Sequence, residues 1–168
     1  MKLIFILFGF LISFQSKSQE GHNYIEGDTL VITNSEFVLD PFQFGLKPML
    51  LLKKQINSID TSIYINRHVD NQFDTLFKLK IGEDQFEVFV NASETFLSKG
   101  IVYSKKFPVH HEIMIGINKD DFAKKLHLDF NKKLPNYFRI RDLEFLTWID
   151  FHFEDNELVE ISFCAISD

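Results

Sequence analysis

Cysteine is almost absent from this chain of 168 residues, which contains only Cys164. A single cysteine excludes an intrachain disulfide and any zinc site built from several cysteines. Cys164 falls in an apolar, strand-like stretch near the C-terminus. We interpret it as a small buried residue, because no basic neighbour in the sequence would activate its thiol; a reactive thiol is the alternative.

Glycine and proline are also scarce, with seven and four residues respectively. They are dispersed, and neither a low-complexity tract nor a long polar stretch divides the chain. Apart from an N-terminal targeting segment, the sequence therefore predicts a single domain over residues 19–168.

Motifs for catalysis and cofactor binding are missing. The chain has no Gly-x-Ser-x-Gly sequence, no phosphate-binding glycine loop and no His-Glu-x-x-His sequence. The densest histidine cluster is His110-His111-Glu112, where adjacent residues of a strand would point to opposite faces, so we expect no metal site. Asp120 and Asp121 suit the N-terminus of a predicted helix better than a pair of catalytic carboxylates. We predict a protein that is not an enzyme, with no catalytic, cofactor-binding or metal-binding residues.

The apolar run at residues 3–14 is too short to cross a membrane comfortably. It has about twelve residues, whereas a spanning helix needs about twenty. Lys2 precedes it and small residues follow at Ser16 and Ser18, a pattern typical of a secretory signal. We predict a signal peptide over residues 1–18 and a mature protein that is periplasmic or secreted. No cysteine for lipid attachment lies nearby, so we expect no stable membrane insertion after cleavage.

Positive charge is in deficit, with 18 Lys and Arg residues against 24 Asp and Glu residues. Removal of Lys2 and Lys17 with the signal peptide leaves a net charge of −8. An anionic surface repels phosphate, and the paired lysines of this chain are scattered along it. We therefore expect no nucleic-acid partner.

Phenylalanine, by contrast, is abundant, with 20 residues. Rings of this size favour a large packed core in a β-rich chain, and an aromatic ligand cavity is the alternative. Alternating apolar residues predict strands at residues 28–34, 61–66, 100–107 and 136–141.

Two segments follow one pattern around Gly45 and Gly116. In each, apolar residues flank the glycine, and polar residues, an apolar helical run and a Lys-Lys pair follow at identical spacing. Each segment predicts a strand that ends at the glycine and a short helix after it, with Asn118 as N-cap in the second. The segments begin two candidate repeat units, at residues 41–91 and 112–166.

The first predicted helix is followed by a predicted hairpin at residues 74–90. We expect Ile81 to lie opposite Phe86, which places the apolar residues of both strands on one face. The same register places Lys80 opposite Glu87, a favourable pair of charges.

A second hairpin is predicted at residues 148–163, with His152 opposite Glu160 as a surface pair. The apolar residues of its two strands share a face only if the loop around Asp155 has three or five residues. The predicted fold class is therefore α+β: an antiparallel sheet packed by two short helices, as two copies of a helix-hairpin unit in one compact body.

This glycine-helix-hairpin unit, used twice, resembles the tandem repeats of β-lactamase inhibitor proteins and the related single-unit fold of the small lipoproteins of outer-membrane protein assembly. The resemblance rests on the stretches "FGLKPMLLLKK", "IGINKDDFAKK" and "FHFEDNELVEISF", under half of the chain. It implies a secreted, non-enzymatic protein whose exposed sheet binds another protein. The chain has neither the lipid-attachment cysteine of the lipoproteins nor the disulfide cysteines of the inhibitors, so no specific activity is carried over.

Two classes of function stay open. One is a non-catalytic protein-binding module, inhibitory or protective, whose partner is another protein of unknown identity. Its candidate binding residues are aromatic side chains on predicted strands, each of which can instead be a core or edge residue: Tyr64, Phe89, Tyr103 and Trp148. The other class is a carrier of a small apolar ligand in the cell envelope, which requires an enclosed cavity between sheet and helices.

Overall fold

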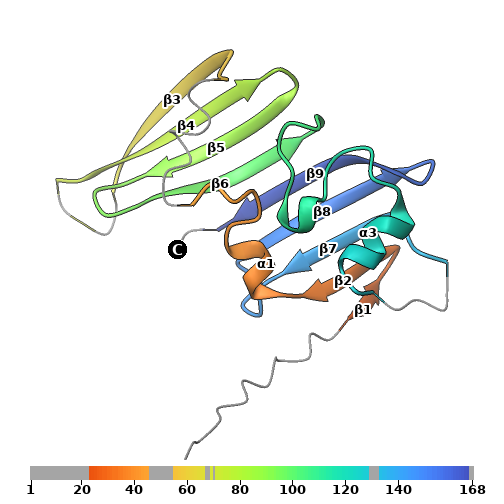
Figure 1. Cartoon of the computed structure of the whole chain (residues 1–168). Coiled ribbons are helices and arrows are strands. Elements are labelled where there is room, and N and C mark those ends of the chain that lie inside the picture. Colours follow the sequence, from red (N-terminus) through yellow and green to blue (C-terminus); the bar gives the residue numbers. More distant parts are fainter. Residues whose placement is uncertain (1–22, 46–54, 67–68, 70, 129–132, 167–168) are drawn as a thin grey trace, which may run out of the picture.

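A computed structural model of the chain describes residues 23–45, 55–66, 69, 71–128 and 133–166. In these residues, nine strands form one sheet in the order β1-β2-β7-β8-β9-β6-β5-β4-β3 (Figure 1). The strands are β1 Tyr24–Glu26, β2 Thr29–Thr33, β3 Ser58–Ile65, β4 Phe73–Ile81, β5 Asp84–Val90, β6 Thr95–Val102, β7 Tyr137–Arg141, β8 Thr147–Glu154 and β9 Glu157–Ala165. The helices are α1 Ser35–Leu39, α3 Lys119–Lys125 and the 3-10 helix η1 His110–Glu112.

The predicted α+β fold class is wrong. Strands hold 51% of the described residues and helices only 12%, so the sheet dominates the fold rather than a helix-hairpin unit. The sheet is also mixed rather than antiparallel, because β2 runs parallel to β7. The physical reason is that α1 and α3, with five and seven residues, are too short to cover a sheet. Strands and loops provide most of the burial instead.

The pattern around the two glycines is only partly realised. Gly45 and Gly116 both have positive φ, 61° and 86°. The second helix, α3, begins after Asn118, whose side chain accepts a hydrogen bond from the backbone N–H of Asp121, as predicted for an N-cap. The strands expected before the glycines do not form, since residues 41–44 and 113–115 belong to no strand. The first predicted helix falls at residues 46–54, outside the described residues.

The hairpin of β4 and β5 forms in a register two residues from the predicted one. Phe86 lies opposite Leu79, not Ile81, and Glu87 lies opposite Lys78. A turn of two residues joins the strands, whereas the predicted register requires a longer loop. Because the shift is even, the apolar residues of both strands still share a face.

The hairpin of β8 and β9 aligns its apolar faces with a β-bulge instead of an odd loop. Its turn has only two residues, Asp155 and Asn156, with φ of 46° and 71°, as in a type I′ turn. The pairing then shifts by one residue, so that Phe153 lies opposite Leu158 and Val159 is the extra residue of the bulge. The prediction of three or five loop residues is therefore wrong. One extra residue is needed, as expected, to bring the apolar residues of both strands to one face, but the bulge supplies it and not the loop.

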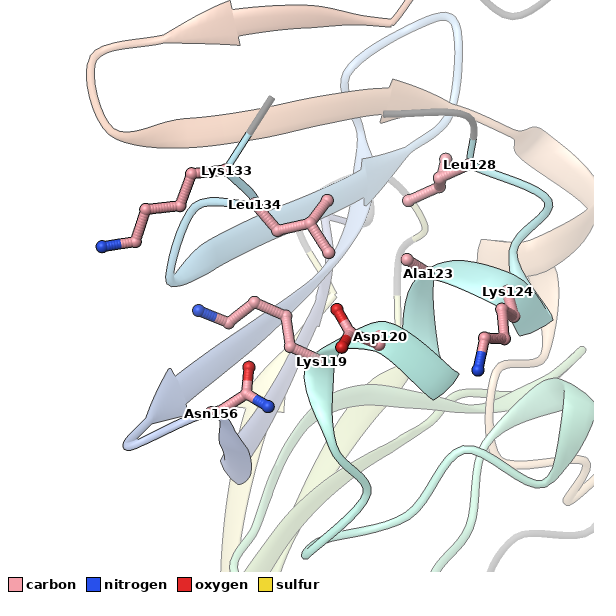
Figure 2. A pocket seen from close by; sticks show the side chains of 8 residues that line it. All are labelled: Lys119, Asp120, Ala123, Lys124, Leu128, Lys133, Leu134 and Asn156. Atoms are coloured by element: carbon pink, nitrogen blue, oxygen red, sulfur yellow. The ribbon is translucent and has the colours of Figure 1, made fainter. Parts of the chain in front are cut away.

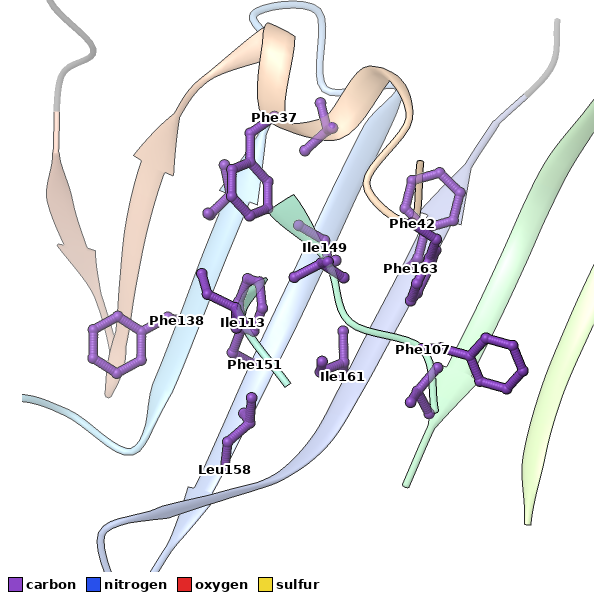
Figure 3. Packing of buried hydrophobic residues seen from close by; sticks show 14 of the residues in the cluster. Phe37, Phe42, Phe107, Ile113, Phe138, Ile149, Phe151, Leu158, Ile161 and Phe163 are labelled. Atoms are coloured by element: carbon purple, nitrogen blue, oxygen red, sulfur yellow. The ribbon is translucent and has the colours of Figure 1, made fainter. Parts of the chain in front are cut away.

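The core lies on one face of the sheet, which we call the inner face. Figure 3 shows side chains of β7, β8 and β9 meeting residues of α1 and of the segments that cross the sheet. At its centre, the ring of Phe122 from α3 lies 4.8 Å from that of Phe151 and 4.9 Å from that of Phe138. Among the described residues, nine phenylalanines are buried, which confirms the prediction that phenylalanine packs in the core.

The two halves of the sheet are covered differently. Figure 1 shows α1 and α3 against β7 and β8, while β6, β5, β4 and β3 extend away from both helices. We call these four strands the β3–β6 wing. On the inner face of its outermost strands, large apolar side chains are at least half exposed: Ile59 (50%), Ile63 (66%), Ile65 (73%) and Phe73 (61%).

Candidate functional site

The four predicted binding residues all lie on the outer face, opposite the core. Tyr64 of β3 is 53% exposed, and Tyr103, just after β6, is 41% exposed. Phe89 of β5 is half-buried against Phe96 of β6, with ring centroids 5.3 Å apart, and Trp148 of β8 is half-buried. The structure therefore brings these residues to one face, but spreads them from β3 to β8 instead of gathering them into one patch.

Three rows of side chains cross β7, β8 and β9 on this outer face, and we call them the outer ladder. The rows are Tyr137-His152-Glu160, Arg139-Asp150-Ser162 and Arg141-Trp148-Cys164. The predicted pairing of His152 with Glu160 is confirmed. The ring of Tyr137 stacks on His152 at 4.5 Å, and Arg139 donates two hydrogen bonds to Asp150, at 2.6 and 2.8 Å.

The electrostatics of the outer ladder do not favour acid-base or nucleophilic chemistry. Burial and the nearby Glu160 carboxylate raise the pKa of Tyr103. Burial also raises the pKa of the Cys164 thiol, which is the opposite of what a reactive thiol requires. The hydrogen bonds to Asp150 raise the pKa of Arg139, so the guanidinium keeps its charge. A hollow of about 200 Å³ between Tyr137 and Glu160 is lined by these already paired groups.

The histidine cluster lies in η1, not on a strand as the sequence analysis assumed. The rings of His110 and His111 pack against Phe37, at 5.3 and 6.1 Å between centroids. Nδ1 of His110 lies 3.1 Å from Nε2 of Gln43, within hydrogen-bond distance. Within the described ranges, no three histidine, cysteine or acidic side chains lie close enough together to hold a metal ion.

The edge of the wing is a surface that sequence reasoning missed. Strand β3 is the terminal strand of the sheet and pairs only with β4 among the described strands. Its inner face carries three isoleucines, and Asp60 is the only charged residue among its eight. The sequence predicts this strand, but a strand pattern alone does not distinguish the edge of a sheet from its interior.

A buried lysine is the other unpredicted feature. Lys119, the first residue of α3, is only 6% exposed. Its Nζ donates a hydrogen bond to Oδ1 of Asn136 at 2.6 Å and lies 5.7 Å from the centre of the Phe153 ring. Burial lowers the pKa of Lys119, and the nearby charge of Lys133 lowers it further. A lysine directly after an N-cap opposes the helix dipole, which is the sequence signal that could have marked it.

Lys119 borders a hollow of about 530 Å³ that is open to solvent (Figure 2). Its lining consists of Lys119, Asp120, Ala123, Lys124, Leu128, Lys133, Leu134 and Asn156. A second open hollow, of about 520 Å³, lies beside Gly116 and Lys105. Neither is the enclosed cavity that a carrier of an apolar ligand requires.

No protein-family model, curated protein or solved structure matches this chain. The resemblance to the inhibitor and lipoprotein repeats therefore stays a prediction. Among the residues that the structure describes, no helix has the length and apolar character needed to cross a membrane.

Proposed function

We propose that this chain is a periplasmic or secreted, non-catalytic protein-binding module, and that its partner adds a strand along β3. The observation that supports the proposal is the exposed apolar edge of the β3–β6 wing. Backbone N–H and C=O groups on an unpaired edge bind an incoming strand, and exposed side chains select which strand binds.

The two edges of the sheet differ in a way that favours this surface. Natural proteins protect sheet edges with short strands, prolines, bulges or charges, because an exposed edge invites pairing. The β1 edge is short, with three residues. The β3 edge has eight residues, no proline, no bulge and a single charge, Asp60.

The side chains of the wing suit a protein partner. Ile63 and Ile65 are 66% and 73% exposed, and Phe73 extends the same apolar surface onto β4. Contiguous exposed apolar side chains are typical of protein-binding surfaces. Tyr64 is the predicted binding residue that belongs to this edge strand, and its side chain points to the outer face. Export is supported by the signal-like residues 1–18, which lie outside the described residues.

The test is a charge placed on the exposed edge. Ile63→Lys should abolish capture of a partner from an extract of the native host envelope, because a lysine at the edge opposes strand addition. Leu39→Lys is the matched control, since Leu39 is 85% exposed at the end of α1, away from the wing. Quantitative mass spectrometry should identify proteins retained by the wild type and by Leu39→Lys but not by Ile63→Lys.

The same partner should then be purified and its binding measured directly. We expect Ile63→Lys to weaken binding by about 2 kcal/mol or more, with an unchanged melting temperature, and the partner to slow amide exchange in β3. Equal binding by both variants, or protection elsewhere but not in β3, would contradict the proposal. Concentration-dependent dimerisation through β3 without any other partner would also contradict it.

A further inference from the structure

The position of Lys119 beside the pocket is unfavourable for folding, because burial of a lysine without a compensating charge costs free energy. This cost suggests that the lysine serves a ligand. Among the described residues, the two contacts of its Nζ, Asn136 Oδ1 and the Phe153 ring, are with uncharged groups, and Asp120 is the one opposite charge that acts on it. A lysine offers three donors, so two remain after the bond to Asn136. The ammonium is therefore suited to accept an anion as a further partner.

The charges around the pocket add to this preference. Of the described residues that line it, three are lysines, Lys119, Lys124 and Lys133, and one is acidic, Asp120. Lys124 is already paired with Asp121, at 2.9 Å. Lys119 and Lys133 remain opposite Asp120, so the described lining residues carry a net positive charge in a chain whose net charge is −6.

Polar and apolar groups are separated within the pocket. Figure 2 shows the side chains of Lys119 and Lys133 extending toward the same side, with Leu134 beside them and Ala123 and Leu128 on the opposite side. Ala123 is buried, and the two leucines are half-buried. A ligand that fits this arrangement has one anionic end and one apolar end.

We propose that this pocket binds a small amphiphilic carboxylate. The carboxylate lies at the ammonium groups of Lys119 and Lys133, and the apolar chain lies over Ala123, Leu128 and Leu134. A single negative charge matches the single excess positive charge of the pocket, whereas a more highly charged phosphate would face Asp120 without enough neutralising groups. Burial lowers the pKa of Lys119, and a bound carboxylate would give its ammonium group a negatively charged partner.

The probe is octanoate, tested on the full mature chain by isothermal titration calorimetry. Three related compounds separate its features: acetate lacks the apolar chain, octylammonium reverses the charge, and inorganic phosphate is an anion without a chain. We expect octanoate to bind at least tenfold more tightly than any of the three. Absence of octanoate binding, or equal binding of octylammonium or phosphate, would overturn the proposal.

Variants locate the site. Lys119→Met keeps the length of the side chain and removes its charge, so octanoate should bind at least tenfold more weakly. Lys133→Gln, at an exposed position, should weaken binding severalfold and serves if Lys119→Met fails to fold. Lys80→Met is the matched control, because Lys80 is an exposed lysine of β4, far from the pocket in the sheet order. Wild-type affinity in Lys133→Gln, or an equal loss in Lys80→Met, would disprove the assignment.

The site is independent of the β3 edge. Lys119→Met should leave capture of a protein partner unchanged, and Ile63→Lys should leave octanoate binding unchanged. Failure of either proposal is therefore distinguishable from failure of the other.

Discussion

At the scale of single residues, Lys119 departs furthest from what its surroundings favour. Its side chain is largely buried, it stands at the positive end of α3, and Lys133 is near. Residues at binding sites commonly reduce stability in this way, because their arrangement serves the ligand rather than the fold.

Lys119→Met should therefore make the unliganded protein more stable. We expect the free energy of unfolding at pH 7 to rise by about 1 to 2 kcal/mol, since the variant buries an apolar side chain of similar length without a charge. Urea unfolding measures this difference, with Lys80→Met as control. A variant less stable than the wild type would mean that the bond to Asn136 and the contact with Phe153 outweigh the cost of burial.

The advantage of the variant should shrink as the pH rises. The pKa of Lys119 is lower in the folded protein than its ordinary value of 10.5, so between these two values the unfolded chain binds more protons. The stability of the wild type therefore increases with pH in this window, relative to Lys119→Met. Lys133 and Asp120 are the charged groups that face Lys119, and both are present in the wild type and in the variant. Unfolding measured at pH 7 and near pH 10 tests the sign.

Residue types allowed part of this to be predicted. Asn118 is recognisable as an N-cap, and the phenylalanines as core, because both follow from local chemistry. The burial of Lys119 was not predictable, because it depends on Asn136 and Phe153, which come from distant parts of the chain.

At the scale of elements, the bulge in the β8–β9 hairpin decides which side chains enter the core. Simple alternation assigns Val159 to the inner face, whereas the structure buries Leu158 to 1% exposure and leaves Val159 half-buried. Leu158→Ala should therefore lower the free energy of unfolding by about 2 to 5 kcal/mol, and Val159→Ala by about 1 kcal/mol or less. Urea unfolding of both variants tests the bulge. If Val159→Ala lowered the free energy of unfolding more than Leu158→Ala, the result would support a hairpin register without the bulge.

Sequence patterns located most strands but not all of their limits. Strands predicted at residues 28–34 and 136–141 match β2 and β7 closely, whereas the strand predicted at residues 61–66 overlaps β3, which begins three residues earlier. The strand predicted at residues 100–107 is displaced, because β6 runs from Thr95 to Val102 with Gly100 inside it. A Cβ at Gly100 would lie 3.2 Å from the Phe86 ring, so the glycine admits that ring rather than starting a strand.

At the scale of the whole molecule, the order of the strands was not predictable from local patterns. Pairs that decide it join distant segments: β2 with β7, and β6 with β9, where Lys99 lies opposite Cys164. Tertiary packing selects such pairs. The alternation of apolar residues within a strand does not indicate which strand will be its neighbour. For the same reason the exposure of the β3 edge, on which the proposed function rests, emerges only from the assembled sheet.

The uneven cover of the sheet predicts a gradient of local stability. Strands β8 and β9 are paired on both sides and contain many buried residues, whereas β3 is paired on one side and exposed on both faces. Native-state amide exchange should be slowest in β8 and β9, with an opening free energy about 2 kcal/mol or more above that of β3. Uniform protection across the sheet would show that the wing is held more firmly than its exposure indicates.

The position of β9 has a further consequence for the newly made chain. This strand follows the other eight in sequence but lies in the middle of the sheet, between β8 and β6. Before residues 157–165 leave the ribosome, β6 and β8 each present an unpaired edge, and no ladder joins the group of β1, β2, β7 and β8 to the β3–β6 wing. The native sheet is therefore completed in its middle by the last of the nine described strands, so it forms only after translation has passed β9.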